Sequence, residues 1–406
     1  MTTRLPARAR ALLVGAAACV VAFALLCHAT AVDDSPNYLE PARSWASGHQ
    51  LREAGHPLES RLPLYPLALG VLIRLAGERP VAFGLFNAAC HIGAVALVWS
   101  VLRQRTTVAA DLVAAAAMAY PPLVTSTALV LQESLLSFLL ALAFVALWQA
   151  VERGSLAWSG AAGAALGLSG LAKVTGLPLV LPAAALVFLA RPGRAAGLAR
   201  SVLLVVAAAA MLLPWALRNR VELGRFEVTN GNGGQTVLGG TVSNRISDWS
   251  TFPEYVEARR AWTERDRAAY PVFDGYLYRV ALRRIMAAPG RWMLLVGERA
   301  LRFMLPARHW LTTVGLARAG SFPPWYVVAT VMNVALFVGA AWAFVLGCRR
   351  RDLPLLVGPL FVFGHQAIYA LTYVSPRYGV TVGPVLFGAA GLALFGRSPS
   401  SPSRSR

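Results

Sequence analysis

The amino-acid sequence predicts an all-α polytopic membrane protein with about ten transmembrane helices, external juxtamembrane helices and a small external α or α+β segment. Of its 406 residues, 57% are apolar and only 14% are charged, whereas roughly half and a quarter are usual in a soluble domain. Apolar runs such as ALLVGAAACVVAFALL and SVLLVVAAAAMLLPWAL approach or reach the roughly 17 to 25 residues that cross a bilayer core. The composition therefore excludes a soluble fold.

The first apolar stretch follows the basic segment MTTRLPARAR and runs to Cys27. It could be a signal peptide, since the tripeptide ATA at 29–31 resembles a cleavage site. We favour an uncleaved anchor, because the stretch is long for the hydrophobic region of a signal peptide. Nine further apolar segments complete the ten expected spans: about 80–102, 108–130, 134–150, 156–172, 174–190, 199–217, 324–347, 353–372 and 379–396.

The distribution of arginine sets the expected orientation, because basic residues in short loops stay in the cytoplasm. Fifteen of the 38 basic residues, against three acidic ones, fall in the N-terminus, the loops after every second span and the C-terminal tail. Both termini are therefore expected in the cytoplasm. The net charge of +19 is thus largely a topology signal, since a nucleic-acid-binding protein would gather its arginines on one face or helix.

Two shorter apolar stretches, 62–76 and 292–306, are interrupted by Arg, Pro or Glu. Counting only the first as a span would move the arginine-rich loops at 103–105 and 349–351 to the outside, against the same rule. We interpret both stretches as membrane-surface or re-entrant helices on the external side.

This topology predicts six parts. They are an N-terminal anchor at 1–29, a first external loop with juxtamembrane helices at 30–79, transmembrane helices at 80–217, an external segment at 218–323, transmembrane helices at 324–396 and a disordered cytoplasmic tail at 397–406. In the external segment, 254–269 reads as a polar helix. The Gly/Asn-rich stretch 229–240 lacks the Gly-Lys-Ser/Thr of a phosphate-binding loop, so we expect turns with positive φ there.

Acidic residues at the external ends of spans are candidates for chemistry, because a carboxylate near hydrocarbon is costly and is often functional. Asp33 and Asp34 follow the first span directly. If both point into one cleft, one of them has a raised pKa and suits a general base; otherwise they are solvated residues that end a helix. Glu133 heads a later span, where it either serves a site or complements the helix dipole.

Four basic residues lie at external span edges: Arg61, Lys173, Arg218 and Arg377. Lys173 is the one lysine of the chain. A cleft that gathers several such cations would hold a phosphorylated lipid head, because guanidinium groups bind phosphate oxygens through a planar fork. For any one of them, snorkelling toward lipid headgroups is the alternative.

Metal and disulfide chemistry have weak support in the sequence. The four cysteines fall in or beside apolar segments without ligand or disulfide spacing, and the six histidines form no HExxH pattern. His49 and His56, with nearby carboxylates, are the one metal possibility. We therefore name no metal ligand and no certain cofactor, and a divalent metal stays possible.

Several motifs, taken in order, resemble those of one family. They are Asp34 with Tyr38 four residues on, Ala42 and Gly48 in YLEPARSWASGH, the proline-rich RLPLYPLALG, the acid-headed span at Glu133, Lys173 after the fifth span, LLPWALRNRVELGRFEVTNGNGG and SPRYGVTVGP. Their order and membrane side resemble bacterial membrane glycosyltransferases of the GT-C fold, in the branch of the protein O-mannosyltransferases and of the aminoarabinose transferases that modify lipid A.

The resemblance implies an inverting transfer of a sugar from a polyprenyl-phosphate donor to an acceptor on the external face of a bacterial cytoplasmic (inner) membrane. The catalytic base of the family maps to Asp34, with Asp33 as its neighbour, and the fourth-span acid maps to Glu133. The family usually has Asp-Glu at the first site, whereas Ser35 follows Asp34 here. The role of a second carboxylate there stays open.

The same resemblance extends to the substrates and their contacts. It implies that Arg61, Lys173 and Arg377 contact the donor phosphate, and Arg218 joins them as a basic group at an external span edge. The donor and acceptor cleft would be lined by three tyrosines: Tyr38, Tyr65 and Tyr378. The expected partners are the lipid-linked sugar, a lipid, glycan or protein acceptor, and the membrane, with no nucleic acid.

Two other classes of function remain possible from the sequence. A non-enzymatic transporter or flippase of lipids or glycans would line its pathway with charged residues, but transporters place polar groups near the bilayer midplane, and the middles of these spans are Ala, Leu and Val. A structural assembly subunit would tolerate replacement of the external acids.

Overall fold

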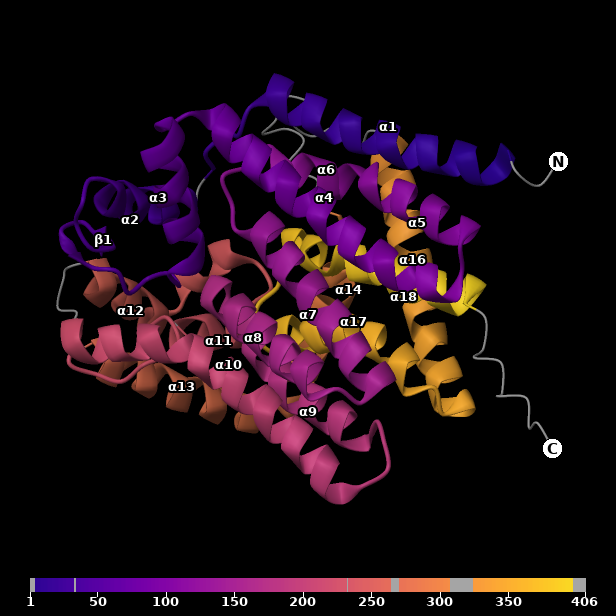
Figure 1. The fold of residues 1–406 in the computed structure, drawn as a ribbon. Helices are drawn as coiled ribbons and strands as arrows, with labels where there is room; N and C mark the ends of the chain where they lie inside the picture. Colours follow the sequence, from indigo (N-terminus) through magenta and orange to yellow (C-terminus); the bar gives the residue numbers. More distant parts are fainter. Residues whose placement is uncertain (1–3, 33, 232, 264–269, 307–323, 397–406) are drawn as a thin grey trace.

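The computed structural model describes residues 4–32, 34–231, 233–263, 270–306 and 324–396, and its elements are shown in Figure 1. Within these ranges, seven helical segments are long and apolar enough to cross a membrane. They are α1 (Arg4–Cys27), α4 (Pro80–Arg105), α7 (Glu133–Arg153), α10 (Arg194–Glu222), α16 (Pro324–Arg350), α17 (Leu353–Leu371), and the 3-10 helix η3 (Pro376–Val382) continued by α18 (Gly383–Phe395).

The other expected spans are broken or short. The segment at 108–130 forms α5 (Val108–Met118) and α6 (Pro121–Thr127), bent by 53° where two prolines begin the second helix; proline cannot continue a preceding helix but suits a first turn. Two shorter apolar segments follow, α8 (Leu156–Ala172) and η1 (Val174–Leu179) with α9 (Val180–Leu189). The predicted all-α membrane fold is confirmed, and ten is an approximate count of its spans.

The loops that the arginine distribution assigns to one side do meet at one end of the bundle. Arg10 of α1 lies 3.8 Å from Asp111 at the start of α5. Arg105 at the end of α4 pairs with Glu152 at the end of α7 and with Asp352 before α17, at 2.9 and 3.1 Å. We call this end the arginine-rich face.

The loop after α1, which the sequence predicts to be external, lies at the opposite end of the bundle (Figure 1). It contains α2 (Pro36–Ala46), a two-stranded antiparallel hairpin of β1 (Arg52–Glu53) and β2 (His56–Pro57), and α3 (Leu64–Ala76). Helix α3 matches the external helix predicted at 62–76, whereas the hairpin was not predicted. In Figure 1, α2 and α3 lie at the same end of the molecule as α12 and α13.

The segment at 218–323, which the sequence also predicts to be external, is mostly helical in its described part. It contains α11 (Gly233–Val242), the 3-10 helix η2 (Ile246–Thr251), α12 (Pro253–Thr263), α13 (Tyr270–Ala287) and α14 (Pro289–Phe303). Helix α12 starts where the polar helix was expected, and residues 264–269 of that prediction lie outside the described residues. Helix α14 corresponds to the stretch predicted at 292–306. The tail at 397–406 also lies outside the described residues.

The Gly/Asn-rich stretch corrects one prediction. We expected turns at 229–240, but residues 233–242 form α11, and none of its glycines has a positive φ. A Cβ on Gly240 would meet the carbonyl oxygen of Thr372, and one on Gly239 would meet the Trp249 ring. These glycines therefore permit close packing of a helix. In a sequence, glycines that serve this purpose look the same as glycines that form turns.

Helix α7 is the centre of the bundle, and its first residue is the candidate site residue Glu133. In its apolar stretch, 83% of the residues are buried, against 11% in that of α1. Helix α7 packs against α4, α8, α17 and α18. Trp148 and Phe144 of α7 are fully buried. Because α7 is packed on all sides, Glu133 at its first position is held firmly at the end of the bundle opposite the arginine-rich face.

Candidate functional site

The loop after α1 is fixed by backbone pairing, which positions Asp34. Thr30 pairs with Leu129 in an isolated parallel bridge, and its amide donates to the Ala128 carbonyl at 2.8 Å. The fully buried hydroxyl of Ser35 donates to the Val130 carbonyl at 2.9 Å and accepts from the Val32 amide at 2.8 Å. Ser35, at the position where the resembled family has a second acid, thus anchors the loop. The sequence reading did not assign it this role.

Asp34 lies between two guanidinium groups. Its Oδ1 accepts from Arg61 Nη2 at 3.0 Å, and its Oδ2 accepts from Arg377. Burial would raise the pKa of Asp34, but Arg377, Arg61 and Lys173 outweigh it and lower the pKa below its usual value. We expected a raised pKa if two carboxylates shared a cleft; for Asp34 the pKa is lowered, because cations surround it. Asp33 lies outside the described residues.

Arg377 joins Asp34 to the second acid. Its Nε lies 3.4 Å from Glu133 Oε1, and the Glu133 side chain is 2% exposed. The other Glu133 oxygen, Oε2, is buried and accepts no hydrogen bond from the described residues. An unpaired buried carboxylate oxygen is costly, so this oxygen is available to a ligand.

Lys173 completes the cationic group over a layer of aromatic rings. It is the residue that ends α8, and its ammonium nitrogen lies 3.5 Å from the centroid of the Tyr378 ring. Tyr369 stacks on Tyr378 with centroids 4.5 Å apart and shares a hydrogen bond with Thr175 at 3.2 Å. The sequence reading missed Tyr369, which no motif marks inside an apolar span.

The other two predicted tyrosines support the first loop. Tyr38 and Tyr65 meet edge to face with centroids 5.3 Å apart, and both are almost completely buried. The Arg61 guanidinium lies 5.5 Å from the Tyr38 centroid. Burial raises the pKa of Tyr38, so its hydroxyl stays protonated and can donate a hydrogen bond.

Arg218 has a different position from the other predicted cations. Its Nη1 donates to the Leu58 carbonyl at 2.7 Å and its Nη2 to the Leu51 carbonyl at 3.3 Å. Its guanidinium also lies 4.7 Å from the Trp215 ring centroid. The structure thus brings Asp34, Glu133, Arg61, Lys173 and Arg377 together, whereas Arg218 connects α10 to the first loop around them.

The described residues do not fit a divalent metal at this site. No three His, Cys, Asp or Glu side chains converge within the described ranges. Both Asp34 oxygens accept from guanidinium groups, and Arg377 occupies the space between Asp34 and Glu133. We therefore derive no step through a metal.

The helical architecture is that of the GT-C fold, as the resemblance implied. Residues 56–217 match the family model of dolichyl-phosphate-mannose-protein mannosyltransferase, a range that includes Arg61, Glu133 and Lys173. No curated protein matches the chain.

Solved structures are similar over nearly the whole chain. The archaeal oligosaccharyltransferase AglB from Archaeoglobus fulgidus, in complex with an inhibitory peptide and a dolichol-phosphate, has a TM-score of 0.57 and 14% identity, covering 95% of this chain and 50% of that one. Its apo form has a TM-score of 0.55 and 13% identity, with coverage of 95% and 50%. The chain thus spans about half the length of AglB.

ArnT from Cupriavidus metallidurans, bound to undecaprenyl phosphate, matches with a TM-score of 0.45 and 21% identity, covering 94% of this chain and 77% of that one. At these identities, the likeness to AglB establishes the fold.

Proposed function

We propose that this protein is an integral membrane glycosyltransferase that moves a sugar from a polyprenyl-phosphate donor to an acceptor, with inversion and with Asp34 as the general base. The convergence of two carboxylates and three cations from five separate chain segments at one end of the bundle carries the proposal. The family model, whose description names a dolichyl-phosphate-linked sugar, and the AglB complex with dolichol-phosphate support the class of donor.

The charge of the cluster suits a lipid phosphate. Asp34 and Glu133 contribute two negative charges, and Arg61, Lys173 and Arg377 contribute three positive ones. The surplus cation favours an anion, and the donor carries its leaving group already activated as a phosphate. Fixed guanidinium and ammonium groups stabilise the charge that grows on this phosphate in the transition state.

The transfer balances through the residues of the cluster. The bond between the anomeric carbon and the phosphate oxygen breaks, and the phosphate keeps the electron pair. The acceptor heteroatom attacks the opposite face of that carbon, and its proton passes to Asp34. The products are the glycosylated acceptor, with inverted configuration, and a free polyprenyl phosphate.

Donor binding prepares the base. Without donor, both Asp34 oxygens accept from guanidinium groups, which makes the carboxylate a weak base. A donor phosphate competes for Arg61 and Arg377, so the pKa of Asp34 rises when it binds. A carboxylate with a higher pKa accepts the acceptor proton more readily. Arg61 and Arg377 thus pair with Asp34 in the absence of donor and with the donor phosphate after it binds.

The orientation follows from the arginine-rich face. We place that face and both termini in the cytoplasm because basic loops are retained there. The Asp34 cluster then lies on the external side, which in a bacterium is the periplasmic face of the cytoplasmic membrane. A lipid, a glycan or a protein on that side can serve as acceptor.

A reconstituted assay tests the proposal. Purified protein in proteoliposomes receives polyprenyl-phosphate sugars and candidate acceptors, and release of polyprenyl phosphate is measured for wild type, Asp34→Asn and Glu133→Gln. We expect turnover by wild type and a loss of about 10²-fold or more in Asp34→Asn, the usual contribution of a general base.

The matched control is Glu78→Gln. Glu78 is also an acid of the external end and pairs with Arg43 at 2.5 Å, but it is exposed and outside the cluster. It should keep wild-type activity. Turnover by wild type with none of the lipid-linked sugars would favour a transporter or a structural subunit, provided that size-exclusion profiles show folded protein.

A further inference from the structure

The arginine-rich face contains a cavity that the proposed chemistry does not use. Its volume is about 510 Å³, within the range of about 300 to 1,000 Å³ typical of small-molecule sites. It opens where α4, α7, α9 and α16 end and α17 begins. The cavity and the Asp34 cluster are at opposite ends of α7, since Glu133 and Glu152 are separated by about 28 Å of helix at 1.5 Å per residue.

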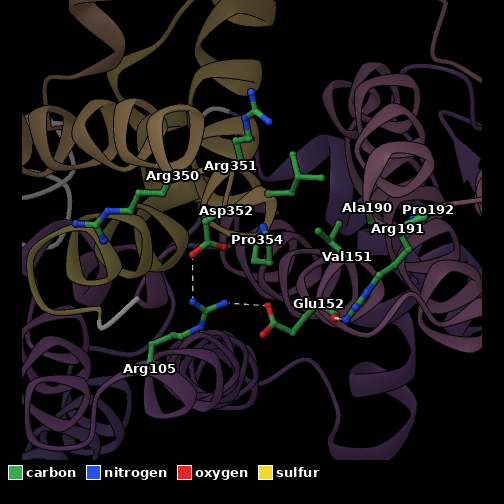
Figure 2. A pocket seen from close by; sticks show the side chains of 11 residues that line it. Arg105, Val151, Glu152, Ala190, Arg191, Pro192, Arg350, Arg351, Asp352 and Pro354 are labelled. Atoms are coloured by element: carbon green, nitrogen blue, oxygen red, sulfur yellow. Dashed lines mark hydrogen bonds and ion pairs between the residues drawn. The ribbon is translucent and has the colours of Figure 1, made fainter. Parts of the chain in front are cut away.

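The floor of the cavity is a fixed ion-pair network. Arg105, whose side chain is 9% exposed, donates to Glu152 at 2.9 Å and to Asp352 at 3.1 Å. Figure 2 shows its guanidinium held between the two carboxylates. Both acidic side chains that line the cavity thus pair with the same arginine.

The rim of the cavity carries further positive charge. It includes Arg191, Arg350 and Arg351, all exposed. Arg191 donates to the Glu152 carbonyl, a neutral acceptor, and neither Arg191 nor Arg351 forms an ion pair with the described residues. Arg105, Arg191 and Arg351 carry three positive charges against the two negative charges of Glu152 and Asp352. The lining therefore has a net positive charge and favours an anion.

The surroundings of the cavity match a membrane lipid better than a soluble anion. Ala190 on its rim directly follows Phe188 and Leu189 of α9, which are 39% and 62% exposed. Exposed apolar side chains on an apolar helix of a membrane protein face the acyl chains. A headgroup in the cavity would therefore have a path along α9 for its tails, and basic pockets between transmembrane helices bind anionic headgroups in this way.

We propose that this cavity binds the phosphate diester headgroup of an anionic phospholipid, attracted by the positive charge of Arg191 and Arg351 on the rim, with the Arg105 network as its fixed floor. The site is independent of the glycosyl-transfer cluster. It makes the packing of α4, α7, α9 and α17 at this face depend on the lipid composition of the membrane.

The experiment uses the whole protein in nanodiscs of neutral phosphatidylcholine, with phosphatidylglycerol added in steps. Lipid retention is measured by native mass spectrometry, and the melting temperature is recorded in parallel. We compare wild type with Arg191→Ala/Arg351→Ala, and with the matched double variant Arg194→Ala/Arg349→Ala. The control removes the same charge from the same face at exposed positions outside the cavity.

We expect phosphatidylglycerol to bind wild type and the control alike, and the cavity variant about tenfold more weakly. The lipid should raise the melting temperature of the first two proteins only. Equal retention in the two double variants would overturn the proposal, since general attraction to a basic surface would then explain it. Competition by soluble glycerol phosphate at the same concentration would overturn the lipid assignment.

Discussion

The bridging residue of the cluster is Arg377, which contacts both Asp34 and Glu133. Each of the three could be selected from sequence, because charged residues beside apolar runs are rare. Their pairing could not, since Arg377 lies more than 200 positions from either acid and only the closed bundle brings them together. The consequence is electrostatic: Asp34 is an ion-paired carboxylate with a lowered pKa, and it is not the strong base that an unpaired buried acid would be.

This pairing predicts a pH dependence. The ionised form of Asp34 accepts the proton, so kcat/KM falls as pH decreases through the pKa of the free enzyme. Cations lower that pKa, so removing one raises it. In Arg61→Gln the acidic limb of the kcat/KM profile should therefore move to higher pH, apart from any change in the height of the profile.

Arg74→Gln is the control for this profile. Arg74 lies on α3, donates to the Trp45 and Ala46 carbonyls and has no contact with Asp34 among those described. Its acidic limb should coincide with that of wild type. An unmoved limb in Arg61→Gln would mean that Asp34 is not the group that titrates.

At the scale of elements, the positions of the apolar stretches were a dependable signal, and glycine was not. Helix α7 begins at the predicted acid, and helices α3 and α14 lie where the short interrupted apolar stretches predicted them. The stretch TNGNGGQTVLGG was misread, because glycine permits both turns and close helix packing. Close packing is seen only from the groups that the glycines contact, Thr372 and Trp249. Nothing in the sequence marks these two residues as contacts.

The close packing of α11 predicts a steric effect. Gly240→Ala would drive a methyl group into the Thr372 carbonyl, which is backbone and cannot rotate away. We expect a loss of about 1 to 3 kcal/mol, typical of overpacking, seen as a lower melting temperature in detergent.

The matching substitution for that test is Gly297→Ala. Gly297 lies inside α14, and a Cβ there meets nothing within 4 Å. It should leave stability unchanged or improve it by about 0.5 to 1 kcal/mol, because alanine favours a helix. Equal effects of the two substitutions would show that helix propensity, rather than contact with Thr372, governs α11.

At the scale of the whole molecule, counting arginines predicted which loops share an end of the bundle. The contacts of Arg10 and Arg105 confirm this grouping. Counting could not predict how the loops pack, because a charge rule contains no geometry. The cavity and its ion-pair network therefore came only from the structure.

The proposed orientation predicts a labelling pattern. In a variant without native cysteines, a cysteine at Gly290, in the first turn of α14, should react with a membrane-impermeant maleimide in intact cells. A cysteine at Ser401 of the tail should react only after the membrane is opened. The reverse pattern would place the Asp34 cluster in the cytoplasm.

The central claim is that Asp34 performs chemistry at a site that binds a lipid phosphate. A single-turnover measurement tests it most directly: enzyme loaded with donor is mixed with acceptor, and both the transfer rate and the retained donor are recorded for wild type and Asp34→Asn. We predict that Asp34→Asn lowers the transfer rate by about 10²-fold or more. Donor retention should be equal or stronger, because the amide frees Arg61 and Arg377 for the phosphate. A rate within a few-fold of wild type at equal donor loading would contradict the account.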